Sequence, residues 1–555
     1  MARSDPGQHL DAQVAVVGAG PVGMTLAGRL AQMGVRVILL EQHPRLTGEG
    51  SKALCMQRET LEIWARLGIG EQVASRGVQW NLGRTYFRGR ELFQVRLPSS
   101  NRDHFPPFVN INQTEVEQML LACITELSEV DLRWSHRLAG IAQDADGVTV
   151  RCETPDGETT LRVAYLVGTD GAHSAVRHST GMSFPGHSFP DLFLICDIRA
   201  RLPFPRERRF FFDPPWNPGR QVLIHPQPDD TWRIDWQVAP GTDVEAERTS
   251  GGLDRRVRAV IGPTTDYQLL WLTPYRFHQR LVERFRIGRV ILAGDAAHVV
   301  SPFGARGLNS GVADAENLAW KLSAVLAGHA SDELLESYDA ERRAAALENL
   351  AVTDASMRFM VPRGRLRRWL RNAILRGSLR MPRLRRLVNS GRLAQPFTYS
   401  DSPIVVADVR DARTPAIGGV APDAPCRSLD TTSVKRLREL FGGGFVALLV
   451  GDAPREAAAA AIRASRLAWP APCHVVAIGP DGSLAGVTVI DDEEGEVRRA
   501  YGVAGSSAYL VRPDGHLAAW IPLKRAEAVD ALPGLQAIAI GVRRPKPRRS
   551  RIGCG

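Results

Sequence analysis

The sequence predicts an α/β protein whose first domain is a Rossmann-like nucleotide-binding sheet. Three observations support this fold class. A glycine turn with Gly18, Gly20 and Gly23 joins an apolar run to a helical segment near the start of the chain. Two later strand-to-helix turns carry acids, at Asp170 and Asp295. The stretch between those two turns is dense in predicted strands, which indicates a sheet inserted into the nucleotide domain.

The first segment has the order that a dinucleotide-binding fold requires. An apolar run at 14–17 is typical of a buried parallel strand, 22–33 is helical, and a second apolar run at 35–40 ends at Glu41. Glycines at G-x-G-x-x-G spacing allow a tight turn, a close approach of a pyrophosphate and close packing of the helix. The free N–H groups at the helix N-terminus favour phosphate. These residues alone do not decide between FAD and NAD.

Length and charge set limits on the protein class. With 555 residues, 44% of them apolar and 23% charged, the chain has the composition of a soluble globular protein of two or three domains. The net charge of +10 is concentrated in ten arginines at 363–386, a stretch without acids, and six basic residues at 543–551. Because the rest is slightly acidic, we expect no nucleic-acid partner and interpret the basic runs as solvated.

Cysteine usage predicts reduced thiols and no metal site. The seven cysteines are scattered without C-x-x-C or zinc spacing. Such a set is typical of a cytoplasmic protein. The sequence also has no apolar signal segment and no apolar run long enough to span a bilayer.

Apolar periodicity predicts the remaining elements of the first two domains. Helices are expected at 60–67, 113–127 and 310–326, and strands at 148–152, 161–167, 192–198, 208–212, 221–225 and 232–238. The last four strands are separated by turn signals, so an antiparallel sheet is expected there.

The C-terminal part predicts a separate small α/β unit. Helical sequence continues to about residue 388, followed by a polar linker. Beyond it, strands are expected at 445–450, 474–478 and 508–511, helices at 434–440 and 455–467, and a hairpin turn at 513–515. The expected domains are 1–185 with 281–388 as one discontinuous domain, 186–280 as the inserted sheet, 389–403 as the linker, 404–542 as the third unit and 543–555 as a basic tail.

Three ordered motifs resemble those of a known enzyme family. The first motif is G-x-G-x-x-G, and the second is D-G-A-H-S-x-V-R from Asp170. The third is G-D-A-A-H from Gly294, followed by G-x-R-G-L-N-S-G and D-A-x-N-L-A-W-K-L. Together they resemble the motifs of the single-component FAD-dependent aromatic hydroxylases, the group A flavoprotein monooxygenases. The resemblance covers residues 12 to about 350. The third unit resembles the thioredoxin-like domain of the 3-(3-hydroxyphenyl)propionate hydroxylase and phenol hydroxylase branch. It lacks C-x-x-C, so a structural role is expected.

The resemblance implies FAD as cofactor, NADH or NADPH as co-substrate, and a set of cofactor contacts. Gly18, Gly20 and Gly23 would hold the pyrophosphate and Glu41 the adenosine ribose. Asp170 would lie beside the pyrophosphate and the NAD(P)H passage. The further contacts implied are Lys52, Arg58, Gln113, Gly294, Asp295 at the ribityl chain, and Gly307, Leu308 and Asn309 beside the flavin ring.

The resemblance and the predicted sheet together supply the catalytic candidates. Arg306 and Pro302 lie in the loop that would pass beside the flavin. A fixed cation at Arg306 would favour hydride acceptance, with an arginine turned to solvent as the alternative. His225 on the inserted sheet is a candidate base, with a packed sheet histidine as the alternative. Phe212, Trp236 and Phe303 are candidates for the pocket wall or for the core.

The resemblance implies a monooxygenase in which NAD(P)H reduces FAD, O2 adds at flavin C4a and one oxygen enters a phenolic ring such as that of 3-(3-hydroxyphenyl)propionate. A polyketide, quinone or antibiotic substrate is the first alternative, and a plain NAD-dependent dehydrogenase is the second. A third is a membrane-surface role for the arginine segment, whose helix has Leu366, Trp369, Leu370 and Ala373 on one side; packing of that helix on the body is the competing interpretation. We expect a small aromatic substrate, O2 and NAD(P)H as partners. We expect no stable membrane insertion, and the sequence is compatible with a homodimer.

Overall fold

The structure is a computed structural model. It describes residues 10–47, 53–97, 99, 103–301, 304–362, 364–378, 381, 395–406, 414–429, 434–451, 471–479, 486–503, 505–523 and 531–541. Lys52, Pro302, Phe303, the helix expected at 455–467 and the basic tail lie outside the described residues.

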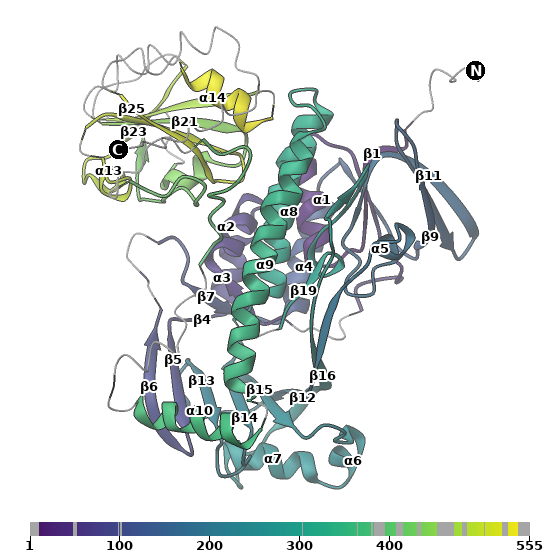
Figure 1. The fold of residues 1–555 in the computed structure, drawn as a ribbon, viewed down its shortest axis with the longest axis vertical. Helices are drawn as coiled ribbons and strands as arrows, with labels where there is room; N and C mark the ends of the chain where they lie inside the picture. The colour runs from purple at the N-terminus through teal and green to yellow at the C-terminus, as the bar shows by residue number, and fades with distance from the viewer. Residues whose placement is uncertain are drawn as a thin grey trace, which may run out of the picture.

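The elements alternate between strands and helices in the first part, are mostly strands in the middle, and include two long helices after it (Figure 1). The strands are β1 Ala12–Val17, β2 Val37–Leu40, β3 Cys55–Gln57, β4 Val78–Trp80, β5 Leu82–Phe87, β6 Arg90–Arg96, β7 Phe108–Asn110, β8 Val130–Arg133, β9 Arg137–Gln143, β10 Val148–Thr154, β11 Gly157–Gly168, β12 Gly186–Arg199, β13 Arg208–Phe212, β14 Gln221–Pro226, β15 Thr231–Val238, β16 Gln268–Leu281, β17 Arg286–Ile287, β18 Val290–Leu292, β19 His298–Val299, β20 Arg427–Ser428, β21 Phe445–Val450, β22 Cys473–Ile478, β23 Thr488–Asp491, β24 Ser507–Val511 and β25 Leu517–Pro522. The helices are α1 Pro21–Gln32, α2 Arg58–Arg66, α3 Gly70–Arg76, α4 Gln113–Thr125, α5 Ala175–Ser179, α6 Val244–Thr249, α7 Gly252–Ile261, η1 Gly294–Ala296, α8 Gly307–Leu326, α9 Leu334–Met360, α10 Arg365–Gly377, η2 Leu437–Leu440, α13 Glu496–Ala500 and α14 Leu532–Ala539.

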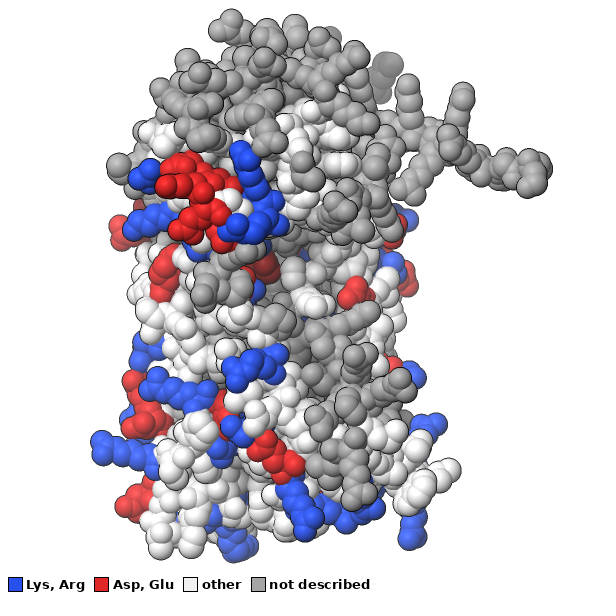
Figure 2. Space-filling view, turned by 90° about the vertical axis from the view of Figure 1, so that its left-hand side faces the viewer, with Lys and Arg blue, Asp and Glu red and all other residues white. Residues whose placement is uncertain are grey.

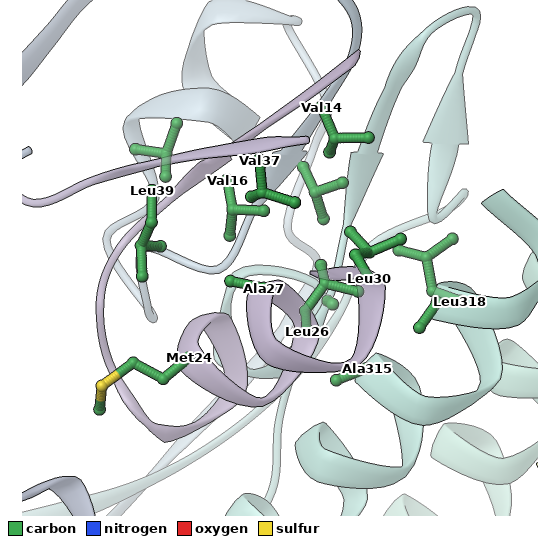
Figure 3. Close-up of a cluster of buried hydrophobic side chains, with 14 of the residues drawn as sticks. Val14, Val16, Met24, Leu26, Ala27, Leu30, Val37, Leu39, Ala315 and Leu318 are labelled. Carbon is green, nitrogen blue, oxygen red and sulfur yellow. The ribbon is translucent and has the colours of Figure 1, made fainter. Parts of the chain in front are cut away.

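The first sheet has a parallel centre in the order β18-β11-β1-β2-β8. Its strands come from two parts of the chain, one before and one after most strands of the middle sheet. β1 pairs with one edge of β11, and the later strand β18 pairs with the other edge. Apolar runs such as that of β1 are buried on both faces, as a parallel sheet covered by helices requires. Figure 3 shows Val14 and Val37 of the strands against Leu26 and Leu30 of α1, with Leu318 of α8 beside them.

The middle sheet corrects one expectation. The inserted strands were expected to form a purely antiparallel sheet, but the observed order is β19-β16-β12-β15-β14-β13-β5-β6, and β13 pairs with β5 in parallel. The sheet is therefore mixed, and the hairpin β5–β6 comes from before the predicted insertion. The physical reason is that β13 would otherwise leave an unpaired edge, which the hairpin covers. The sheet's outer face packs on α7 through Trp232, Trp236 and Val257.

The third sheet is also mixed, in the order β20-β23-β22-β21-β24-β25. β21, β22 and β23 are parallel, whereas β24 and β25 form an antiparallel hairpin around the turn at 513–515. The helix expected at 434–440 is only the short 3-10 turn η2. In Figure 1 this unit lies at one end of the molecule and the middle sheet at the other, with α9 running between them. None of the described helices combines the length and apolar content that a membrane span requires.

Candidate active site

The glycine turn and the turn at Thr169 form one packed unit. Gly18 has φ +102°, a conformation that favours glycine, and a Cβ on it would lie 2.8 Å from the carbonyl oxygen of Thr169. The Thr169 hydroxyl donates to the carbonyl oxygens of Val17 and Gly18, both at 2.9 Å. A Cβ on Gly23 would lie 2.0 Å from the Gly18 carbonyl oxygen, so this glycine sets how closely α1 approaches the turn.

Glu41 lies at the end of β2, beside the same turn. One carboxylate oxygen accepts from the Ala19 backbone N–H at 2.9 Å, and the other accepts from the His43 N–H at 3.0 Å. The carboxylate is thereby held next to the N-terminus of α1, and the remaining lone pairs of its oxygens are available for hydroxyl donors.

Asp170 is turned towards α5. Its carboxylate accepts from the Val176 N–H at 3.1 Å and from the Ser174 hydroxyl, and so caps this short helix. Burial raises the pKa of Asp170 above its usual value. The open side of the turn is formed by its neighbours Thr169 and Gly171.

The third motif is organised by Asp314 of α8. One oxygen of Asp314 accepts from the Gly294 N–H at 3.0 Å and contacts His298 Nε2 at 2.7 Å, and the other accepts from Arg342 Nε at 2.6 Å. Burial opposes ionisation of Asp314, but Arg342 and His298 hold its pKa below the usual value. This arrangement fixes the turn so that the exposed side chain of Asp295 faces a cavity.

The loop before α8 is tied down by Asn309. Its amide donates to the carbonyl oxygens of Cys55 at 2.9 Å and Ala305 at 2.6 Å, and its oxygen accepts from the Gln57 N–H at 2.9 Å. Ala305 has φ +54°, a strained conformation for a residue with a Cβ. Arg306 is not turned to solvent: it is buried and donates to the Asn349 side chain on α9.

These motifs meet around a cavity of about 410 Å³ between the first and middle sheets. The predicted residues that line it are Gly20, Gln113, His225, Asp295, Arg306, Gly307, Leu308 and Asn309. A Cβ on Gly20 or Gly307 would meet nothing within 4 Å, so both glycines border open space. Of the other predicted residues, Arg58 instead pairs with Asp103 at 3.0 Å and donates to the Phe105 carbonyl oxygen at 2.8 Å.

The N-termini of α1 and α8 both border this cavity, and helix N-termini stabilise anions. A dinucleotide has an anionic pyrophosphate at its centre. The cavity reaches from the glycine turn past Asp295 to the loop before α8, so the chemistry of its walls fits FAD.

Polar side chains of the middle sheet line the far wall of the cavity. They are Arg208 on β13, His225 on β14, and Arg233 and Asp235 on β15. The strand register pairs His225 with Arg233 and Leu223 with Asp235, so all of them share the inner face. Among the described residues, His225 Nδ1 and Asp235 Oδ1 are buried and have no hydrogen-bond partner. Such atoms are costly unless a ligand or water satisfies them.

Charge and burial set the protonation of these groups. Burial raises the pKa of Asp235 to about 7, against the opposing effect of Arg233. Burial, and then the nearby Arg208 and Arg233, lower the pKa of His225 well below its usual value, so that the imidazole is neutral at pH 7. Arg233 is itself held by Asp197, with Nε–Oδ1 and Nη2–Oδ2 distances of 2.8 Å.

The sequence reasoning missed Arg208, Arg233 and Asp235. A signal was present, because Arg233 and Asp235 alternate with the apolar residues of β15, but such a pattern usually indicates a solvent-exposed face. Of the two alternatives given for the aromatic candidates, the described ones belong to the core. Trp236 packs on the outer face of the sheet, and Phe212 lies in the aromatic cluster that extends from the cavity wall, but neither lines the cavity.

A larger cavity of about 720 Å³ lies between the first and third sheets. Its charged walls are already paired: Arg29 contacts Glu316 at 2.8 Å, Arg436 contacts Asp423 at 2.7 Å and Arg438 contacts Glu62 at 3.4 Å. Of these pairs, Arg438–Glu62 joins the third unit to the first domain, and Arg29 also donates to the Gly442 carbonyl oxygen at 3.0 Å. Because the charges of the larger cavity serve this contact, we assign the chemistry to the smaller cavity.

Comparison with known proteins agrees with this site. A model of the FAD binding domain family matches residues 11–353. A 3-(3-hydroxy-phenyl)propionate/3-hydroxycinnamic acid hydroxylase of Mycobacterium sp. (strain JLS) is 31% identical over 94% of this chain and 91% of its own length. The crystal structure of aklavinone-11 hydroxylase with FAD and aklavinone is 27% identical with a TM-score of 0.76, and covers 96% of this chain and 100% of its own. The flavin-dependent monooxygenase PieE has the same fold, at 23% identity, a TM-score of 0.80 and the same coverage.

The family match spans more than half of the chain, and the curated relative spans nearly all of it. The fold, the two helix N-termini at the cavity and the three motifs are thereby accounted for together. The chain belongs to the FAD-dependent group A monooxygenases, aromatic hydroxylases that use NAD(P)H as electron donor.

Proposed function

We propose that this hydroxylase acts on a phenol with a short carboxylate side chain, of which 3-(3-hydroxyphenyl)propionate is the type. The observation that carries the proposal is Arg208. This guanidinium lines the cavity and forms no ion pair with a carboxylate of the described residues; burial lowers its pKa, against the effect of the more distant Asp235. A partly buried cation without an ion-pair partner favours an anionic ligand. The name of the mycobacterial relative supports the same substrate class.

We further propose that Asp235 accepts the proton of the substrate hydroxyl. Loss of that proton makes the ring electron-rich and therefore reactive towards an oxygen donor. Asp235 Oδ1 has no protein partner among the described residues, and its carboxyl group has a pKa near 7, which suits a general base at neutral pH. His225 remains a candidate as the neutral group that hydrogen-bonds the same hydroxyl.

For the cofactor, the proposal assigns the pyrophosphate to the glycine turn and the N-terminus of α1, the adenosine ribose to Glu41, and the ribityl chain to Asp295. The loop residues Gly307 to Asn309 would lie beside the flavin ring. Bound FAD supplies the oxygen-activating chemistry. Arg306 would supply a buried cation beside the ring that stabilises negative charge there, and the apolar sheet residues Phe193, Leu223 and Phe277 would exclude water.

The domain boundaries proposed from the sequence place the first sheet in the discontinuous FAD-binding domain and β12 to β16 in the substrate domain. The other strands of the middle sheet, β5, β6 and β19, lie outside 186–280. For the third unit we propose a thioredoxin-like fold. The parallel strands β21 and β22 followed by the antiparallel hairpin β24–β25 support it. The described part contains no C-x-x-C, so this unit has a structural role.

A second candidate is a polycyclic polyketide or antibiotic substrate. The similarity to aklavinone-11 hydroxylase over 96% of this chain favours it. A neutral polycyclic substrate would leave Arg208 without a counter-ion, whereas a phenolic acid would satisfy it.

Substrate-stimulated NAD(P)H oxidation, with product identified by mass, separates the two candidates. We expect stimulation by hydroxyphenylpropionates. Arg208→Gln should raise KM for the acid by about 10- to 100-fold, the strength of a charged hydrogen bond, and change KM for the matching amide little. Arg209→Gln is the control, because the Arg209 side chain pairs with Glu207 at 3.2 Å instead of lining the cavity. Equal effects on acid and amide, or stimulation by polycyclic compounds alone, would overturn the carboxylate assignment.

A further inference from the structure

Helix α10 presents an apolar stripe to solvent. Leu366 is 76% exposed, Trp369 64% and Leu370 53%, which makes them the most exposed large apolar side chains among the described helices. Scattered exposed apolar residues are ordinary, but a contiguous set containing a tryptophan usually marks an interaction site. With 100° per residue, Leu366, Trp369, Leu370 and Ala373 fall within one sector of about 100°.

The opposite side of α10 is its anchor to the body. Arg371 is 5% exposed and its Nη1 donates to the Met360 carbonyl oxygen at 2.9 Å. Leu375 is fully buried in the aromatic cluster that includes Phe210 and Phe212. These anchors lie about 170° from the centre of the apolar stripe on the helix. The expected packing of the helix on the body therefore exists, but it uses the other side and leaves the apolar stripe outward.

Arginines flank the stripe on both sides. Arg365 and Arg376 project along one edge and Arg367 along the other, and all three are exposed. The sequence has no acid between residues 363 and 386. Asp354, on the preceding helix α9, is paired with Arg358 at 2.6 Å. Figure 2 looks onto the side of the molecule on which α10 lies in Figure 1, and shows basic side chains spread over its lower part with acidic side chains among them.

We propose that α10 docks the enzyme on the surface of an anionic lipid bilayer. An interfacial helix inserts its apolar side chains, such as leucine and tryptophan, at the depth of the lipid headgroups. Arginines beside them contact the lipid phosphates. Charge complementarity decides the occupant. A second copy docking through the same stripe would bring arginine against arginine with no acid on the segment to offset them. An anionic bilayer offers both an apolar layer and negative charge in one plane.

The docking is peripheral and reversible. A stripe of four apolar side chains is short, so electrostatic attraction supplies much of the affinity and the binding must weaken as salt rises. The middle sheet lies directly behind α10, so that docking places the substrate domain, rather than the third unit, at the membrane.

Flotation with vesicles tests the proposal on the full-length holoenzyme. The wild type should float with phosphatidylcholine vesicles containing about 30% phosphatidylglycerol and remain in solution with phosphatidylcholine alone. Leu366→Ser with Trp369→Ser should weaken partitioning about tenfold or more, as should Arg365→Glu with Arg367→Glu. The matched controls are Leu347→Ser, whose side chain is 46% exposed on α9, and Arg151→Glu on β10, and both should float like the wild type.

FAD content and substrate-stimulated NAD(P)H oxidation should be unchanged in all variants, because none of the substituted side chains lines the cavity. Failure of the wild type to bind anionic vesicles overturns the proposal. A monomer-to-dimer shift that the Leu366 and Trp369 variant abolishes, seen by light scattering without lipid, overturns it in favour of a second copy. Equal binding to neutral and anionic vesicles overturns the charge-complementarity argument.

Discussion

Asp235 is a carboxyl group that the middle sheet keeps close to its neutral form. Burial and the neighbouring Asp197 raise its pKa, whereas Arg233 and Arg208 lower it. Cys55 and His225 face the same part of the cavity but carry no charge at pH 7, since burial raises the pKa of the Cys55 thiol to about 12 and lowers that of the His225 imidazole. Among these three side chains, Asp235 is therefore the one whose charge changes near neutral pH.

At this scale we predict the pH dependence of hydroxylation. Only the deprotonated form of Asp235 accepts a proton, so kcat/KM should rise with pH through about 7. Asp235→Asn keeps the shape of the side chain but removes this limb of the profile, and should lower kcat/KM by about 100-fold or more. The measurement is kcat/KM for product formation between pH 5.5 and 9, a range set about the cited pKa. An unchanged acid limb in the variant would exclude Asp235 as the base.

The residues of the site were predictable where they belong to a motif. Asp295 and the loop residues after Arg306 were identified from the resemblance of their motif to that of the family, and the structure brings them to one cavity. Arg208 and Asp235 were not, because their burial depends on which sheet face meets the first domain. The spacing of residues along a strand determines which of them share one face of the sheet, but not which part of the protein covers that face.

At the scale of elements, the glycine turn depends on close contact between α1 and the backbone before it. The Gly23 Cβ position lies 2.0 Å from the Gly18 carbonyl oxygen and 2.6 Å from Thr169 Oγ1, so any side chain there pushes the helix off the turn. The Thr169 hydroxyl donates a hydrogen bond to the Gly18 carbonyl oxygen, so a shift of the glycine turn also shifts the turn before Asp170.

We predict that Gly23→Ala destabilises the protein by about 1–3 kcal/mol, the cost of overpacking, and releases much of its FAD. Bound flavin is measured by absorbance after gel filtration, and stability by denaturant unfolding. Gly443→Ala is the control: it is exposed, and its added Cβ would meet nothing within 4 Å. A fully flavinated Gly23→Ala protein of normal stability would contradict this account of the turn.

The mixed character of the middle sheet shows where element prediction stops. Alternating strands between 186 and 280 were visible in the sequence, but the parallel pairing of β13 with β5 joins segments more than a hundred residues apart. No local periodicity encodes such a pairing.

At the scale of the whole molecule, a buried ion network joins the third unit to the FAD-binding part. Glu341 of α9 accepts from Arg512 at 2.6 and 3.0 Å and from Lys321 at 2.7 Å, and all three side chains are inaccessible to solvent. Burial lowers the pKa of Lys321 to about 8 despite the partner. Arg512 and Lys321 depress the pKa of Glu341, whose stabilising contribution is present above its unfolded pKa and is lost as pH falls.

We predict that Glu341→Gln lowers the free energy of unfolding by about 3–5 kcal/mol, because the buried Lys321 then loses its paired carboxylate and Arg512 keeps only Asp514. Thermal unfolding followed by circular dichroism measures the change. Glu336→Gln on the same helix is the control, since its exposed side chain pairs with Arg286 at 3.0 Å and a surface pair contributes about 0–1 kcal/mol. Equal loss in both variants would mean that the network does not join the units.

The division into units was visible in composition, whereas their docking was not. Arg512 and Glu341 are separated by 171 positions, and each taken alone is an ordinary charged residue. Only the folded molecule shows that they neutralise each other.

Helix α9 contacts all three parts of the protein. Glu341 binds the third unit, Asn349 binds Arg306 in the flavin-side loop, and Met357 packs into the aromatic cluster of the middle sheet. Removing one residue between Glu341 and Asn349 would rotate everything beyond it by about 100° and shift it by about 1.5 Å. Insertions and deletions inside this helix would therefore misalign cofactor loop and substrate wall together, so length variation in the chain can be accommodated only outside it.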